Sequence, residues 1–158
     1  MRRRSVQGQR RTLRFRKVIR APLPFVYRWC TDFREDDHRL TEDIYHYAAR
    51  ILLREPRRIV REVVVPGPNR NRNTELEIIT LAPPNGWSLR KLSVTDDKRG
   101  TYRLTSLGSN RTALEMRFQE NWKASRLPNR GRYRALFDRV WDRYVQLMEA
   151  EFRRLRSN

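Results

Sequence analysis

The segment Arg130–Arg156 reads RGRYRALFDRVWDRYVQLMEAEFRRLR, and its apolar residues recur at steps of three and four. They are Tyr133, Leu136, Phe137, Val140, Trp141, Tyr144, Leu147, Met148, Phe152 and Leu155. This spacing predicts a single helix of about seven turns with an apolar stripe along one side. Because so aromatic a stripe is unstable in water, we expect the helix to pack across a sheet.

The region before this helix has the alternating pattern of strands separated by turn signals. We expect strands at Thr12–Arg20, Tyr45–Arg54, Arg57–Val65, Thr74–Leu81, Trp87–Thr95, Arg99–Leu107 and Arg111–Lys123, with a hairpin turn at Asp96–Lys98. Pro22 and Pro24 favour a short helix at Phe25–Thr31, and the acidic segment Asp32–Asp43 is irregular or helical. Consecutive strands joined by short turns give an antiparallel sheet. The fold class is therefore α+β.

Composition places the chain among globular proteins of one domain, and its charge is strongly basic. Hydrophobic residues make up 38% of the chain, and the net charge is +18. Of the 36 basic residues, four are Lys and 32 are Arg. We expect residues 1–11 to form a basic flexible tail and residues 12–158 to form a single domain. A charge of this size is typical of proteins that bind nucleic acid or an anionic membrane surface. Arginines that alternate with apolar residues are, however, also typical of a solvated sheet face.

Two stretches resemble the START-like, helix-grip superfamily, which includes polyketide cyclases and pollen-allergen ligand carriers. One is Val18–Tyr27, VIRAPLPFVY, followed by Thr31-Asp32-Phe33, and the other is Gly100–Leu104 leading to Asn110–Leu114. The resemblance implies a curved seven-stranded antiparallel sheet that grips the C-terminal helix, with two short helices between the first and second strands. It also implies that a hydrophobic small molecule is held between sheet and helix, and in some members cyclised or dehydrated. The acidic Glu35–His38 segment departs from the family, where many members have Trp and Pro.

The candidate ligand-binding residues are those expected to face the space between sheet and helix. They are Tyr102, Leu104, Met116, Phe118, Glu120, Trp122, Tyr133, Phe137, Trp141 and Tyr144. For any one of them, plain core packing is the favoured alternative. Glu120 alternates with Phe118 and Trp122, so an inward carboxylate there would act as an acid, a base or a ligand anchor. Glu62, between Val60 and Val64, is a similar candidate, and the favoured alternative for both is a carboxylate that is exposed to water or paired with an arginine.

Other reactive side chains carry weaker signals. Cys30 fits a buried helix position, and as the only cysteine it favours a reducing compartment, so we expect a cytoplasmic protein. His38 beside Asp36 and Asp37 lacks the further ligands of a metal site, and His46 fits a solvated face. No cofactor motif is present, and we expect neither a metal nor a cofactor.

Three function classes follow from the sequence. The first is a carrier or sensor that binds a hydrophobic molecule or lipid in a cavity. The second is a cyclase or dehydratase acting on a polyketide-like or aromatic substrate. The third is a basic surface that binds nucleic acid or an anionic membrane. An inward Arg that pairs with an anionic ligand group would fit the first two classes, but the sequence does not identify which Arg this is.

Overall fold

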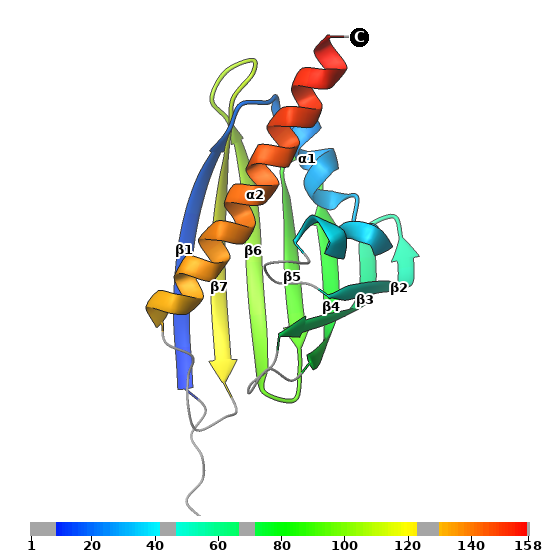
Figure 1. Ribbon diagram of the computed structural model, residues 1–158, viewed down its shortest axis with the longest axis vertical. Helices are drawn as coiled ribbons and strands as arrows, with labels where there is room; N and C mark the ends of the chain where they lie inside the picture. The colour runs from blue at the N-terminus through cyan, green and yellow to red at the C-terminus, as the bar shows by residue number, and fades with distance from the viewer. Residues whose placement is uncertain (1–8, 42–46, 67–71, 123–129, 158) are drawn as a thin grey trace, which may run out of the picture.

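The computed structural model describes residues 9–41, 47–66, 72–122 and 130–157, and its elements follow the order expected for the fold. The strands are β1 (Gln9–Ile19), β2 (Ala48–Glu55), β3 (Arg58–Pro66), β4 (Arg72–Ala82), β5 (Gly86–Leu92), β6 (Asp96–Ser106) and β7 (Thr112–Trp122). The helices are α1 (Leu23–Thr31), the short 3-10 helix η1 (Glu35–Leu40) and α2 (Arg130–Arg156). The strands form one antiparallel sheet in the order β1-β7-β6-β5-β4-β3-β2 (Figure 1). This confirms the predicted α+β architecture.

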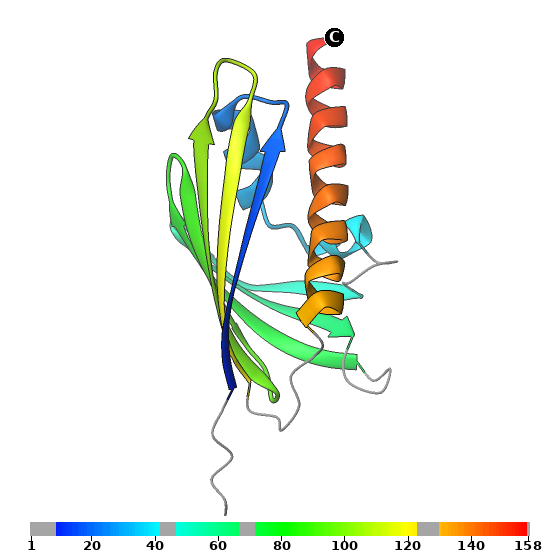
Figure 2. The ribbon, with the colours of Figure 1, turned by 90° about the vertical axis from the view of Figure 1, so that its left-hand side faces the viewer.

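Helix α2 crosses one face of the sheet, and the sheet curves toward it. Figure 2 shows β2 to β5 bending to the side on which α2 lies, so that sheet and helix enclose the core between them. The bounds of α2 are those expected from the apolar spacing. On β1, Leu13, Phe15 and Ile19 are buried beneath the helix, as the alternating pattern predicts. The core is therefore the layer between the concave sheet face and α2.

Polar contacts fix α2 to the first part of the chain. The Lys17 ammonium lies 3.1 Å from Asp138 and 2.7 Å from Asp142 of α2. Near the other end of the helix, the Trp29 indole N–H donates to Glu151 at 3.0 Å. These contacts join β1 and α1 to acidic side chains of α2.

Two local expectations were wrong. The β5–β6 turn lies at Ser93–Thr95, and Asp96 already belongs to β6, because the Ser93 hydroxyl accepts hydrogen bonds from the amides of Thr95 (3.2 Å) and Asp96 (3.1 Å). In β2, a bulge between Ile51 and Leu53 shifts the register and breaks the expected alternation, so that Leu53 is exposed. Tyr45 and His46 lie outside the described residues.

The N-terminal strand begins earlier than predicted. β1 starts at Gln9, so residues 9–11, which were expected in the basic tail, pair with β7 instead. The rest of that tail, residues 1–8, lies outside the described residues. Within the ranges that the structure describes, no helix combines the length and the apolarity needed to cross a membrane.

Candidate functional site

A row of charged side chains crosses the concave face of the sheet, at the same level on neighbouring strands. This inner charged row consists of Arg11, Glu120, Lys98, Lys91, Glu77 and Arg61, each opposite the next in the strand register. Glu75 and Asp96 lie beside it. Most of these side chains are almost fully shielded from solvent, which is unusual for charged residues unless they are paired.

Ion pairs connect the row from Arg61 to Lys98, and Arg11 and Glu120 form a further pair. Arg61 Nε lies 2.5 Å from Glu77 Oε2, and Lys91 Nζ lies 2.7 Å from Glu77 Oε1. Glu75 bridges the two lysines, at 3.7 Å from Lys91 and 3.6 Å from Lys98. Asp96 lies 3.0 Å from Lys98 Nζ. Each buried charge therefore has an opposite charge within about 4 Å, the range at which a pair offsets part of its desolvation cost.

The two ends of the row have different surroundings. At the first end, Arg11 pairs with Glu120 at 2.5 Å, and Tyr133 of α2 also hydrogen-bonds Glu120. The guanidinium of Arg11 lies 4.8 Å from the ring centre of Tyr133 and 5.8 Å from that of Trp122, which closes this end. At the other end, Arg61 lies under the ring of Phe33 and opens onto a cavity. A molecule in the cavity could therefore contact the charged groups at the Arg61 end of the row.

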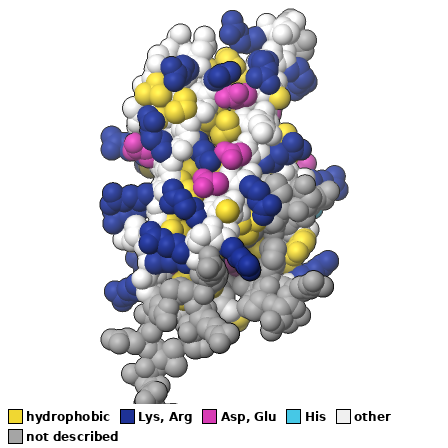
Figure 3. Space-filling model, turned by 60° about the vertical axis from the view of Figure 1, so that its left-hand side comes forward, with side chains coloured by type: hydrophobic (Ala, Val, Ile, Leu, Met, Phe, Trp, Pro, Cys, Tyr) yellow, Lys and Arg dark blue, Asp and Glu magenta, His cyan; other side chains and the backbone are white. Residues whose placement is uncertain are grey.

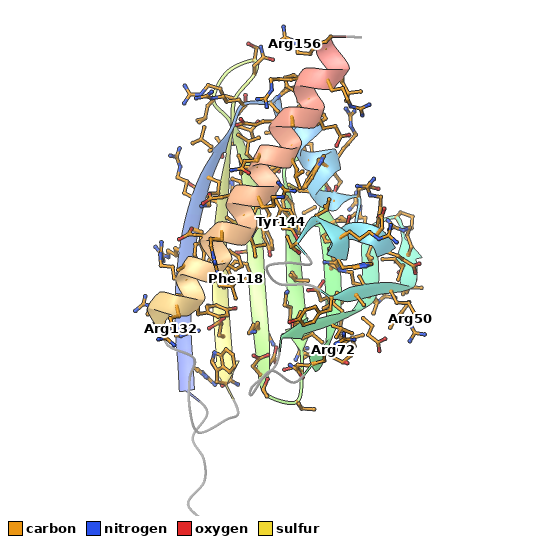
Figure 4. The ribbon with its side chains drawn as sticks, viewed as in Figure 1. Arg50, Arg72, Phe118, Arg132, Tyr144 and Arg156 are labelled. Carbon is orange, nitrogen blue, oxygen red and sulfur yellow. The ribbon has the colours of Figure 1, made fainter. Side chains whose placement is uncertain are left out.

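The central cavity lies between the sheet, α2, α1 and η1, and has a volume of about 130 Å³. Aromatic side chains make most of its wall. They are Trp29, Phe33, Trp87, Tyr102, Phe118, Tyr133, Phe137, Trp141 and Tyr144. Trp87 and Tyr102 are stacked at 4.7 Å, and Trp141 meets Tyr144 edge-on at 5.3 Å. Figure 4 shows Phe118 and Tyr144 in the space between sheet and helix, whereas Arg50, Arg132 and Arg156 lie at the periphery.

The polar part of the wall combines the inner charged row with η1. Arg61, Glu77, Lys91 and Lys98 line the cavity from the sheet, and Asp37 lines it from η1. Asp37 lies 3.6 Å from Arg61 and accepts a hydrogen bond from the Arg34 amide at 2.9 Å. Burial raises the pKa of Asp37 above its usual value, although the Arg34 amide and Arg61 act in the opposite direction.

The pKa values of Arg61, Tyr102 and Tyr144 in the cavity wall are also shifted. Burial alone would lower the pKa of Arg61, but Glu77 and Asp37 more than offset it and the pKa rises. Burial raises the pKa of Tyr102 and of Tyr144, whose hydroxyl oxygen is hydrogen-bonded to Thr41. The site therefore presents a permanently charged guanidinium, neutral phenols and one carboxyl group that ionises less readily than usual.

The ten predicted ligand-binding residues fall into three places. Those that line the central cavity are Tyr102, Phe118, Tyr133, Phe137, Trp141 and Tyr144. Leu104 and Met116 are buried in the core without lining the cavity. Glu120 points inward as predicted, but with Trp122 it belongs to the closed end of the inner charged row. Their role toward a ligand stays a prediction.

Glu62 does not point inward, because Arg61 takes the inward position on β3, and the alternative of a solvated, Arg-paired carboxylate is the one that the structure shows. Glu62 lies on the outer sheet face and pairs with Arg50 at 3.4 Å, where both side chains are exposed to water. The run Ile59 to Val65 has apolar residues on both faces, and this hides which face is buried. Sequence reasoning also missed Asp37 as part of the wall, since it appeared only as one acid among several.

The remaining candidates show no metal site. His38 lines the cavity, and its Nδ1 lies 2.8 Å from the carbonyl oxygen of Glu35. Cys30 also lines the cavity, and burial raises the pKa of its thiol, so it is not an activated nucleophile. Among the described residues, no three His, Cys, Asp or Glu side chains come together as metal ligands would.

Comparison with known proteins finds likeness in structure but not in sequence. No protein-family model matches the chain. No curated protein matches its sequence either. Zhui aromatase/cyclase from Streptomyces sp. R1128 superposes with a TM-score of 0.73 at 17% identity, over 92% of this chain and 95% of that one. A START superfamily protein from Mycobacterium smegmatis superposes with a TM-score of 0.68 at 13% identity, over 91% and 98%. Ara h 8.0201 gives a TM-score of 0.66 at 8% identity, also over 91% and 98%. The chain therefore has the helix-grip fold of START-like proteins and aromatase/cyclases.

Proposed function

We propose that the protein is a carrier or sensor that binds a small aromatic molecule bearing an acidic or carbonyl oxygen in the central cavity. The observation that carries this proposal is the combination of an aromatic wall with the inward guanidinium of Arg61. Apolar pockets with a few convergent polar groups are the general form of small-molecule sites. Structural likeness to a START superfamily protein and to an aromatase/cyclase supports this class of ligand.

The size and polarity of the cavity favour a ring over a long acyl chain. A cavity of roughly this volume accommodates a benzene-sized ring, and flat aromatic walls provide stacking partners for it. The charged side chains on the sheet side of the cavity would make no favourable contact with a methylene chain. Arg61 makes one hydrogen bond to the described residues, to Glu77, and a guanidinium has five N–H donors. Its other donors suit the oxygen of a carboxylate, an enolate or a carbonyl group.

The test uses benzoate as the probe, with toluene as its uncharged counterpart. Trp29, Trp87 and Trp141 line the cavity, so binding is followed by the change in tryptophan fluorescence. We expect benzoate to bind the unchanged protein, and Arg61→Met to weaken it at least tenfold while toluene binding changes little. Arg50→Met is the matched control, because Arg50 lies on the exposed face of the neighbouring strand.

Two results would contradict the proposal. One is equal carboxylate affinity of the Arg61→Met and Arg50→Met proteins, both shown to be folded by circular dichroism. The other is a native mass spectrum of the protein from a lipid-rich extract in which only acyl chains are bound. The second result would indicate a lipid carrier in place of an aromatic-ligand protein.

A second candidate function, a cyclase or dehydratase, is favoured by the carboxyl group of Asp37. A carboxyl group in the cavity wall with a raised pKa is the kind of group that can act as a general base or acid toward a bound molecule. In an intramolecular aldol reaction, Asp37 would take the proton from the carbon next to one carbonyl while Arg61 holds the enolate oxygen. After the enolate carbon has attacked the second carbonyl, Asp37 would return this proton to the new alkoxide. Loss of the second proton from the same carbon together with the hydroxyl group then releases water and leaves the enone. Incubation with a 1,5-diketone tests this, since cyclisation with loss of water gives an absorbing enone. No enone above the rate seen with the Asp37→Asn protein would exclude this activity for that substrate class.

A further inference from the structure

The face of the sheet that points away from α2 carries a second row, different in character from the first. This outer row consists of Arg14, Arg117, Thr101, Ser88, Thr80 and Arg58, each opposite the next in the strand register. All six residues are exposed. The row crosses β1, β7, β6, β5, β4 and β3, which at about 4.8 Å per strand spacing spans about 24 Å.

A shallow groove of about 1,110 Å³ follows this row. Its floor is low because Thr80, Ser88 and Thr101 are short, and because Gly86 and Ala82 lie beside them. Its outer rim carries four arginines from the sheet, Arg14, Arg16, Arg103 and Arg117, and one carboxylate, Glu115, which is opposite Arg16 and Arg103 in the strand register. We call this feature the outer groove. It lies on the opposite face of the sheet from the central cavity.

Two arginines of the outer groove are placed in a way that folding alone does not explain. Arg14 lies directly opposite Arg117 on the neighbouring strand. Like charges placed directly opposite each other destabilise a sheet. Within the part of the chain that the structure describes, Arg14, Arg16, Arg103 and Arg117 form no ion pair and no side-chain hydrogen bond. Figure 3 shows basic side chains spread over one side of the molecule, with acidic side chains between some of them.

We propose that the outer groove binds the sugar–phosphate backbone of a double-stranded nucleic acid. Arginine guanidinium groups and Ser or Thr hydroxyls are the side chains that contact phosphate oxygens, and such contacts are independent of sequence. Duplex DNA has a phosphate on each strand every 3.4 Å, so the length of the outer row corresponds to about seven base pairs. This function is independent of the ligand proposed for the central cavity.

The make-up of the groove also argues against other anionic partners. Single strands are bound by stacking their bases on aromatic side chains, and the groove exposes none, since Phe15, Trp87 and Tyr102 point to the other face and are buried. Membrane binding uses exposed large apolar side chains beside the basic ones. Among the described residues these are Tyr47, Leu52, Leu53, Val94, Leu107 and Leu155, and all of them lie outside the groove.

The test measures the fluorescence anisotropy of a labelled duplex of 20 base pairs, as DNA and as RNA, across a salt series. Arg14→Gln with Arg117→Gln removes the opposed pair of the groove. Arg143→Gln with Arg154→Gln is the control, because it removes the same charge from exposed positions on α2. We expect the groove variant to lose at least tenfold in affinity at low salt, and its slope of log affinity against log salt to fall by about two. We expect the control to lose less than threefold.

A third variant, Ser88→Glu, places a carboxylate in the floor of the groove without removing an arginine. We expect it to reduce duplex binding at least as strongly as the groove variant, because it repels phosphate from the centre. Equal loss in the groove and control variants would overturn the proposal, since it would show a response to net charge alone. So would tighter binding to an unpaired 20-nucleotide strand, or to vesicles with anionic headgroups, than to either duplex.

Discussion

Replacing Glu77 with Gln isolates the charge at the centre of the inner charged row. The substitution keeps the shape of the side chain but removes the negative charge that serves two buried cations, Arg61 at 2.5 Å and Lys91 at 2.7 Å. The amide NH₂ of the new Gln would also face either the Arg61 guanidinium or the Lys91 ammonium, and both of these are hydrogen-bond donors that cannot accept from it. Glu77 has no exposed surface, so water cannot replace the lost carboxylate.

The expected loss of stability follows from what the two cations retain. Removing one partner of a buried ion pair costs about 3–5 kcal/mol. Arg61 keeps Asp37 at 3.6 Å, and Lys91 keeps Glu75 at 3.7 Å, so each still has one acid nearby. We therefore expect a loss near the lower limit, about 3 kcal/mol. For a chain of this length, 1 kcal/mol shifts Tm by about 2–4 °C, which gives a fall of about 6–12 °C.

The assay is thermal unfolding followed by circular dichroism at neutral pH, with Glu62→Gln as the matched control. Glu62 lies on the neighbouring strand, on the outer face, and pairs with Arg50 where both side chains are exposed. An exposed pair of this kind contributes about 0–1 kcal/mol, so the control should keep nearly the Tm of the unchanged protein. Equal Tm values for the two variants would refute the argument that the inner charged row is a mutually dependent buried network.

Three further predictions concern single residues. Because burial raises the pKa of Asp37, its ionised form opposes folding above the unfolded pKa and this penalty disappears at acidic pH. Asp37→Asn should therefore raise Tm relative to the unchanged protein more at pH 7 than at pH 3, and a constant difference would contradict this. A Cβ on Gly100 would lie 2.7 Å from Phe118 Cε1, so Gly100→Ala should cost about 1–3 kcal/mol in thermal unfolding, and an unchanged Tm would show that the Phe118 ring moves freely. Ser93→Ala removes the hydroxyl that accepts from the amides of Thr95 and Asp96, so it should cost about 1 kcal/mol and speed hydrogen exchange at the Asp96 amide; unaltered exchange there would contradict the role assigned to Ser93.

The elements of the fold were predictable because their signals are local. The apolar spacing in Arg130–Arg156 defines a helix without reference to any partner, and the strand alternation in Thr12–Arg20 defines its buried face. The proline-rich start of α1 also marks a boundary by backbone geometry alone. The β5–β6 turn was misplaced because Ser93 carries the turn through its side chain, a weaker signal than the two acids that follow it.

The charged part of the site was not predictable from single strands. A carboxylate that alternates with Leu76 and Ile78, as Glu75 and Glu77 do, has the pattern of a solvated face. Both acids are nevertheless buried, because their partners Arg61, Lys91 and Lys98 come from three other strands. The pairing exists only once the sheet has formed, so no local pattern indicates it. The aromatic part of the cavity was foreseeable, since large apolar rings on β6, β7 and α2 can only face each other.

The inner charged row also limits which alignments of the strands are allowed. Sliding β4 by two residues against β3 keeps every side chain on its own face, so the apolar pattern alone does not oppose it. In the native alignment Glu77 is opposite Arg61. A slide in either direction would put Glu77 opposite Ile59 or Val63, an uncompensated charge against an aliphatic side chain. The same groups that line the polar side of the cavity therefore destabilise shifted strand registers, which the apolar pattern alone would not distinguish from the native one.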